Sequence, residues 1–217
     1  MRFCALLLCC AAWIVADAQS KVYYSHEDFF ADKGEVLDTV YVEQHGKSRQ
    51  LWWGGNDYKL TTGDSQLDKE IKKNAFAVVT QGDSIYVNCR NLRLEKTGFG
   101  NGYTRGMRIG EHSILIVNRL IGREMAAEAQ TASFLLGAMG GMAAASKSMK
   151  QQVCYVISSG ADQKGRVDIR MVDESLIKLM LEGHPDVYLE YLQVTDKSKR
   201  NLASRVIPLL TKAGLLK

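Results

Sequence analysis

The sequence has no internal repeat, no low-complexity tract and no long run of basic residues. Its formal net charge is only +4 over 217 residues, and its one short basic cluster, Lys197, Lys199 and Arg200, is typical of a solvated helix face. These features argue against a nucleic-acid-binding protein. With 46% hydrophobic and 24% charged residues, the composition is that of an ordinary globular domain.

Motifs for enzymatic chemistry are also missing. Ser158 and Ser159 lack the G-x-S-x-G frame of a nucleophile elbow, and no C-x-x-C or paired-histidine spacing indicates zinc. After Gly98 and Gly100, Tyr103 stands where a dinucleotide fingerprint needs glycine or alanine. The sequence therefore predicts no catalytic residue, no metal site and no cofactor. The histidines lie outside the apolar runs and are predicted as surface or turn residues: His26, His45, His112 and His184.

The first 18 residues have the pattern of a secretory signal peptide. Arg2 precedes an apolar run from Phe3 to Val15, and Ala16-Asp17-Ala18 satisfies the small-x-small rule for cleavage. The apolar run is too short for a membrane span. We therefore expect export through the Sec pathway to the periplasm, cell envelope or exterior, with cleavage after Ala18 and a single mature domain over residues 19–217.

The order of the predicted elements indicates an α+β fold. Short apolar or β-branched runs make residues 21–118 a largely antiparallel β region, with one strand over Glu35 to Gln44 and a hairpin turning at Gly110 to His112. A long helix is predicted over residues 121–149 and a strand pair over residues 153–172. Residues 173–213 form a helical tail, in which Asp173 caps one helix and the last helix runs from Lys197 to Lys212.

The helix predicted over residues 121–149 is rich in glycine and alanine. Small residues at every fourth position form a helix packing face with almost no side chain: Ala129, Ser133, Gly137, Gly141 and Ala145. Each glycine inside a helix costs about 1 kcal/mol relative to alanine, so close packing must offset this cost. Three partners are considered for this face: the sheet of the same domain, a second copy of the chain, or lipid around a span over residues 129–146.

Two cysteines remain after signal cleavage, Cys89 and Cys154. Each lies in a short apolar run that is predicted as a strand. In an oxidising compartment the pair can form a disulfide, which would stabilise the fold by about 2 to 4 kcal/mol. The alternative is two buried free thiols that behave as small apolar side chains.

An aromatic segment is the strongest candidate for a ligand surface. Trp52, Trp53 and Tyr58 lie beside Asn56 and Asp57, and this combination can stack on a sugar ring and bond its hydroxyl groups. Since neighbouring strand residues point to opposite faces, Trp52 and Trp53 enter one core together only if both faces are covered. The alternative is that these aromatic side chains pack against the Gly/Ala helix.

Several segments follow one another in a recognisable arrangement. The signal peptide precedes residues 24–29, 75–78, 84–88 and 100–103, then the Gly/Ala helix and a final segment around His184 to Asp186. This arrangement resembles an uncharacterised exported family of Bacteroidetes-type Gram-negative bacteria, a domain of unknown function. The resemblance implies export and supplies no activity.

Taken together, these patterns favour a non-enzymatic envelope or secreted module. Such a module binds an unidentified protein partner, or associates with itself, through the Gly/Ala helix. Two alternatives stay open: a carbohydrate-binding or glycan-processing protein that uses the aromatic segment, and a membrane-associated protein with residues 129–146 in the bilayer.

Overall fold

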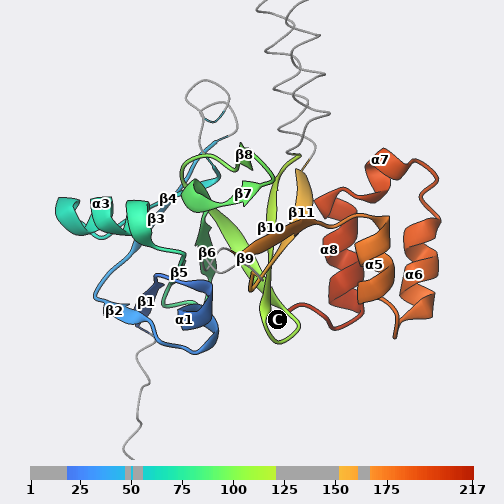
Figure 1. The fold of residues 1–217 in the computed structure, drawn as a ribbon, viewed down its shortest axis with the longest axis horizontal. Coiled ribbons are helices and arrows are strands. Elements are labelled where there is room, and N and C mark those ends of the chain that lie inside the picture. Colours follow the sequence, from blue (N-terminus) through green and yellow to red (C-terminus); the bar gives the residue numbers. More distant parts are fainter. Residues whose placement is uncertain (1–18, 47–49, 51–55, 121–151, 161–166) are drawn as a thin grey trace, which may run out of the picture.

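The computed structural model describes residues 19–46, 50, 56–120, 152–160 and 167–217. Within them the chain forms an antiparallel sheet flanked by helices (Figure 1), which confirms the α+β class. The main strands are β1 (Ser20–Tyr23), β2 (Glu35–Leu37), β5 (Ala77–Val79), β6 (Ile85–Asn88), β9 (Tyr103–Ile109), β10 (Ser113–Arg119), β11 (Gln152–Ser158) and β12 (Asp168–Met171). Their order across the sheet is β12-β11-β10-β9-β6-β5-β1-β2.

Smaller elements complete this framework. A ribbon of β3 (Tyr41–Gln44) and β4 (Tyr58–Thr61) joins the sheet where β4 meets β9. A short helix η1 (Cys89–Asn91) leads into the small hairpin of β7 (Arg93–Leu94) and β8 (Thr97–Gly98). The α-helices are α1 (His26–Phe30), α3 (Ser65–Asn74), α5 (Glu174–Met180), α6 (Pro185–Leu192), α7 (Lys197–Arg200) and α8 (Ala203–Lys212).

The two faces of the sheet are covered differently. Successive strand residues alternate between faces, so Ile114 and Ile116 of β10 lie in one apolar cluster and Leu115 lies in another. The C-terminal helices cover the second face at β10 and β11, and α3 covers it near β5 and β6 (Figure 1). On the first face, one cluster runs from Tyr23 of β1 to Ile169 of β12 and is covered by α1 and the η1–β7–β8 segment.

The sheet curls over its first face. In a flat sheet β1 and β12 would be six strand spacings apart, which is about 29 Å at about 4.8 Å each. Yet residues directly after β1, such as His26, and residues of β12, such as Ile169, line the same cavity. The curvature therefore brings segments from opposite ends of the chain together on the first face.

Two predicted elements are wrong because each is divided in the structure. The predicted strand over Glu35 to Gln44 is two strands, since β2 pairs with β1 whereas β3 pairs with β4. The predicted helix over Lys197 to Lys212 is interrupted at Leu202, whose extended backbone forms a β-bridge with Val153 before α8 begins. In both cases a long-range pairing partner decides where the element ends.

Other predicted elements are confirmed. The hairpin turn at Gly110 to His112 joins β9 to β10, and Gly110 has a φ of +61°, which favours glycine. The Asp173 side chain accepts a hydrogen bond from the Leu176 backbone at 2.9 Å and caps α5. The predicted strand pair over residues 153–172 is β11 and β12.

Several sequence predictions fall outside the described residues. These are the signal peptide over residues 1–18, the whole helix over residues 121–149 with its small-residue face, and the membrane span over residues 129–146. In the part of the chain that the structure describes, every helix is too short or too polar to cross a bilayer.

Candidate functional site: the His26 pocket

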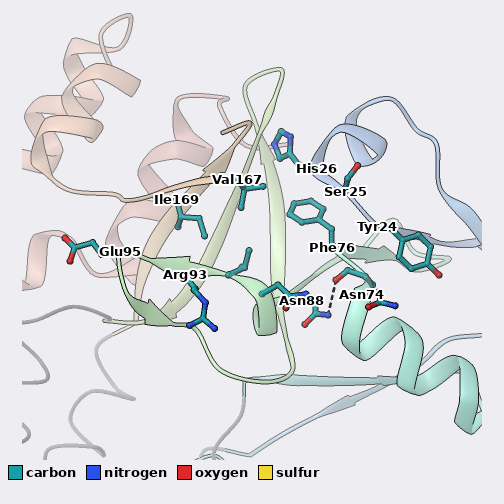
Figure 2. Close-up of a pocket in the computed structure, with 13 residues that line it drawn as sticks. Tyr24, Ser25, His26, Asn74, Phe76, Asn88, Arg93, Glu95, Val167 and Ile169 are labelled. Atoms are coloured by element: carbon teal, nitrogen blue, oxygen red, sulfur yellow. Dashed lines mark hydrogen bonds between the residues drawn. The ribbon is translucent and has the colours of Figure 1, made fainter. Parts of the chain in front are cut away.

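A cavity of about 510 Å³ opens on the first face of the sheet, between the segment that follows β1 and the segment around β12. We call it the His26 pocket. Figure 2 shows that residues from both segments and from the η1–β7 region surround it. Its lining includes His26, Phe76, Leu92, Arg93, Val167 and Ile169.

The start of α1 fixes one wall of the pocket. Ser25 is the N-cap of this helix, and its Oγ accepts a hydrogen bond from the Asp28 backbone at 3.0 Å. The same hydroxyl donates to the Asp28 carboxylate at 2.7 Å. Phe29, which is fully buried, anchors the helix on the sheet. His26, the first residue of α1, is therefore held at a defined position.

His26 is buried, with only 4% of its surface exposed, and its Nε2 atom has no hydrogen-bond partner. The ring packs against Phe30 and Phe76, with centroid distances of 4.7 and 5.8 Å. Burial lowers the pKa of His26 below its ordinary value, although the nearby Glu27 carboxylate and a backbone hydrogen bond to His112 oppose the shift. Burial thus favours the neutral form of the imidazole.

Nε2 of the ring is buried and has no hydrogen-bond partner in the described part of the chain. A neutral imidazole has one donor and one acceptor nitrogen, so its tautomer can adapt to the group that it meets. His26 therefore adds one unsatisfied polar atom to the wall of the pocket.

The remaining walls divide into an apolar floor and a polar rim. Phe76, Leu92, Val167 and Ile169 belong to, or pack against, the apolar cluster of the first face. Arg93, Glu95 and Asn74 are exposed at the rim. An apolar floor with a few placed polar groups is the usual composition of a small-molecule pocket.

Two asparagines in the wall have structural roles. Nδ2 of Asn88 lies within 3.0 Å of the carbonyl oxygens of Lys72 and Ala75, so the buried side chain caps the end of α3. Nδ2 of Asn91 donates to the Lys73 carbonyl at 3.0 Å. Because these donors are already used within the protein, we do not assign them to a ligand.

The pKa shift of His26 predicts an acid-sensitive fold. Because the pKa of His26 is lower in the folded chain, the unfolded chain binds the proton more readily. The stability that comes from keeping His26 neutral is therefore fully present above about pH 6.5 and is lost as the pH falls towards the folded pKa. We expect the His26→Phe variant to lose this part of the pH dependence, measured as the free energy of unfolding in urea between about pH 7.5 and 5. His184→Gln, which removes a histidine outside the pocket, should retain it. An unchanged slope in His26→Phe would contradict the assignment.

A protein-family model matches most of the chain. It describes DUF6563, a family of unknown function, and covers residues 21–217. The chain belongs to the DUF6563 family. No curated protein and no solved structure matches the chain. The family is one of unknown function, as the resemblance in the sequence predicted.

In this DUF6563 chain, the described residues of the predicted ligand surface do not form one open face. Asn56 is buried; its Nδ2 donates to the carbonyls of Phe99 at 3.1 Å and Asn101 at 2.9 Å, and its Oδ1 accepts from Asn118 at 2.9 Å. The Asp57 carboxylate accepts from Gln50 at 2.7 Å. Tyr58 packs on Tyr86 with ring centroids 5.1 Å apart, and burial raises its pKa. Trp52 and Trp53 lie outside the described residues.

The disulfide considered from the sequence does not form in this DUF6563 chain. Cys89 and Cys154 are both buried free thiols. Cys89 belongs to the cluster on the first face of the sheet, whereas Cys154 belongs to the cluster under the C-terminal helices. The sheet therefore separates the two sulfur atoms. Burial raises the pKa of the Cys154 thiol to about 12, which keeps it protonated and unreactive.

Sequence reasoning missed the His26 pocket. It predicted His26 as a surface or turn residue, which is wrong, since the side chain is buried. The available signal was the position of His26 directly after a capping Ser25 and three residues before Phe29, which places it in the first turn of an apolar helix. Among the described residues, no cluster of three or more histidine, cysteine or acidic side chains is placed to hold a metal ion.

Proposed function

We propose that the mature chain is an exported, non-enzymatic module that binds a ligand in the His26 pocket. The observation that carries this proposal is the buried Nε2 atom of His26, which has no hydrogen-bond partner in the described part of the chain and belongs to the wall of an apolar-floored cavity. The ligand class follows from the walls. It has an apolar body that covers Phe76, Val167 and Ile169, and a hydroxyl or amide group that hydrogen-bonds Nε2 when the imidazole turns towards the cavity.

Energetics support a ligand at this position. A buried polar atom without a hydrogen bond costs about 1 to 3 kcal/mol, and buried polar groups in proteins are nearly always paired. A bound donor would remove this cost. The apolar floor would add about 25 cal/mol for each Å² of ligand and wall surface removed from water.

Export and partner binding complete the proposal. The N-terminal pattern supports secretion to the periplasm, envelope or exterior, and the family resemblance supports a Bacteroidetes-type bacterial origin. The small-residue face that includes Gly137 and Gly141 supports close association with a protein partner or a second copy of the chain. Export and partner binding rest on the sequence and are independent of the His26 pocket.

Two matched probes test the ligand class. Benzyl alcohol and toluene have the same ring, but only benzyl alcohol can donate a hydrogen bond to His26. We expect benzyl alcohol to bind more tightly than toluene by about five- to tenfold, which corresponds to about 1 to 1.4 kcal/mol, as measured by NMR titration of the signals of Phe76 and Ile169. In His26→Phe the two probes should bind equally.

Filling the pocket provides a second test. Val167 is partly buried against the pocket floor, so Val167→Trp is expected to weaken benzyl alcohol binding by at least about tenfold, or about 1.4 kcal/mol. Val36→Trp places the same ring at a valine of β2 that is 53% exposed, and binding should be unchanged. Equal binding to both variants would contradict the site. Methyl glucoside in the same titration tests a carbohydrate ligand. If it binds more tightly than benzyl alcohol, the ligand is a sugar and not an apolar compound.

A further inference from the structure

A second cavity, of about 620 Å³, lies on the same face of the sheet near the C-terminal end of α1. Its charged and polar lining residues are Gln19, Lys21, Tyr23, Asp32, Asp83, Arg108 and Lys217. The residues of the His26 pocket are not among them. The two cavities therefore present different side chains to a ligand.

Arg108 is the central group of this second cavity. Its guanidinium carbon lies 4.4 Å from the ring centroid of Phe29 and 5.2 Å from that of Phe30, so α1 supplies an aromatic platform for the cation. The backbone of Arg108 is fixed as well, because its N–H and carbonyl both bond Lys217, at 3.2 and 3.0 Å. The side chain is half-buried and its position is defined.

The guanidinium forms no direct ion pair in the described part of the chain. Asp32, a carboxylate of the cavity wall, is already engaged by Lys21 at 2.9 Å and by the Tyr23 hydroxyl at 2.7 Å. These two hydrogen bonds, and after them the charges of Lys21 and Arg108, hold the pKa of Asp32 below its usual value. Arg108 therefore faces the cavity as a cation with five N–H donors and an aromatic support, which is the arrangement that binds planar oxyanions.

The charges of the wall indicate which oxyanion fits. Asp32 and Asp83 lie in the same wall as the cations Lys21, Arg108 and Lys217. A ligand carboxylate brings one negative charge to this wall, whereas a phosphate dianion would bring two beside Asp32 and Asp83. We propose that the second cavity binds the carboxylate of a small organic acid, held by Arg108 through paired N–H donors.

The test is an NMR titration of the folded mature chain with sodium acetate at constant ionic strength, maintained with chloride. We expect a saturable shift of the Arg108 Nε signal and of the backbone signals of Ile85 and Asp83. Arg108→Met keeps an unbranched side chain over Phe29 and should weaken acetate binding by at least tenfold. Arg105→Met, on the same strand and the opposite face, should bind as the parent chain does; Arg105 is exposed and bonds Ser84.

A second variant keeps the test valid if Arg108→Met does not fold. Arg108→Lys retains the charge and the packed stem but lacks the two-pronged donor set, so acetate should bind several-fold more weakly than to the parent chain. Three results would overturn the proposal: shifts that never saturate, equal affinities in the parent chain and both Arg108 variants, or tighter binding of inorganic phosphate than of acetate. Benzyl alcohol binding to the His26 pocket is measured on the same samples, so failure at one cavity is distinguished from failure at the other.

Discussion

Replacing Phe99 by alanine is expected to lower the free energy of unfolding by about 3 to 5 kcal/mol. Phe99 is only 1% exposed, and its ring meets that of Tyr155 edge-on with centroids 4.9 Å apart. Its backbone N–H is also fixed, at 3.1 Å from the Leu92 carbonyl. The surrounding cluster can collapse only partly into the space left by the ring, so both burial and packing are lost. Urea unfolding followed by circular dichroism measures the change.

Tyr41→Ala is the matched control for this prediction. Tyr41 lies on β3 and is 61% exposed, so truncation there removes an aromatic ring without opening a cavity. We expect a change within about 0.5 kcal/mol, as is usual for surface substitutions. A loss below about 1 kcal/mol in Phe99→Ala would show that residues 98–100 do not form part of the core.

The second large effect concerns Asn56. Its side chain bonds Phe99, Asn101 and Asn118, which connects the segment before β4 to the loop before β9 and to β10. Asn56→Leu leaves the buried amide of Asn118 without this acceptor and the Phe99 carbonyl without this donor. At about 1 to 3 kcal/mol for each buried group left unpaired, we expect a loss of about 2 to 4 kcal/mol. The measurement is the midpoint and slope of urea unfolding.

Asn101→Ala separates the side-chain network from a general effect of losing an asparagine. The Asn101 side chain is exposed, and only its backbone carbonyl accepts the bonds from Asn56. That carbonyl remains in the variant, so stability should change little. Comparable losses in the two variants would mean that the side-chain bonds of Asn56 do not account for its effect.

Local features of the fold could be predicted from the sequence because nearby residues determine them. The spacing of Leu67 and Ile71 and the polar residues around them predict α3, and Asp64 caps it through the Gln66 backbone at 2.7 Å. Pro185 similarly marks the first turn of α6. These signals need no knowledge of tertiary contacts.

The candidate site could not be predicted because distant segments form it. Nothing within a few residues of His26 indicates that Val167 and Ile169 will lie across the same pocket. Asn56 shows the same limitation, since its sequence neighbours suggest an exposed ligand surface and its real partners are 43 to 62 residues away. Arg108 looks like an ordinary strand residue until α1 places Phe29 beneath it.

The curled sheet also has a kinetic consequence. Because the walls of the His26 pocket come from residues 24–26 and from residues 167–169, the pocket exists only after the strands between them have paired. Folds that depend on such distant contacts form slowly, typically in milliseconds to seconds. A ligand of this pocket would not recognise partly folded chains, so its full binding energy would add to the stability of the native state. Occupancy of the pocket would then report that a chain has finished folding.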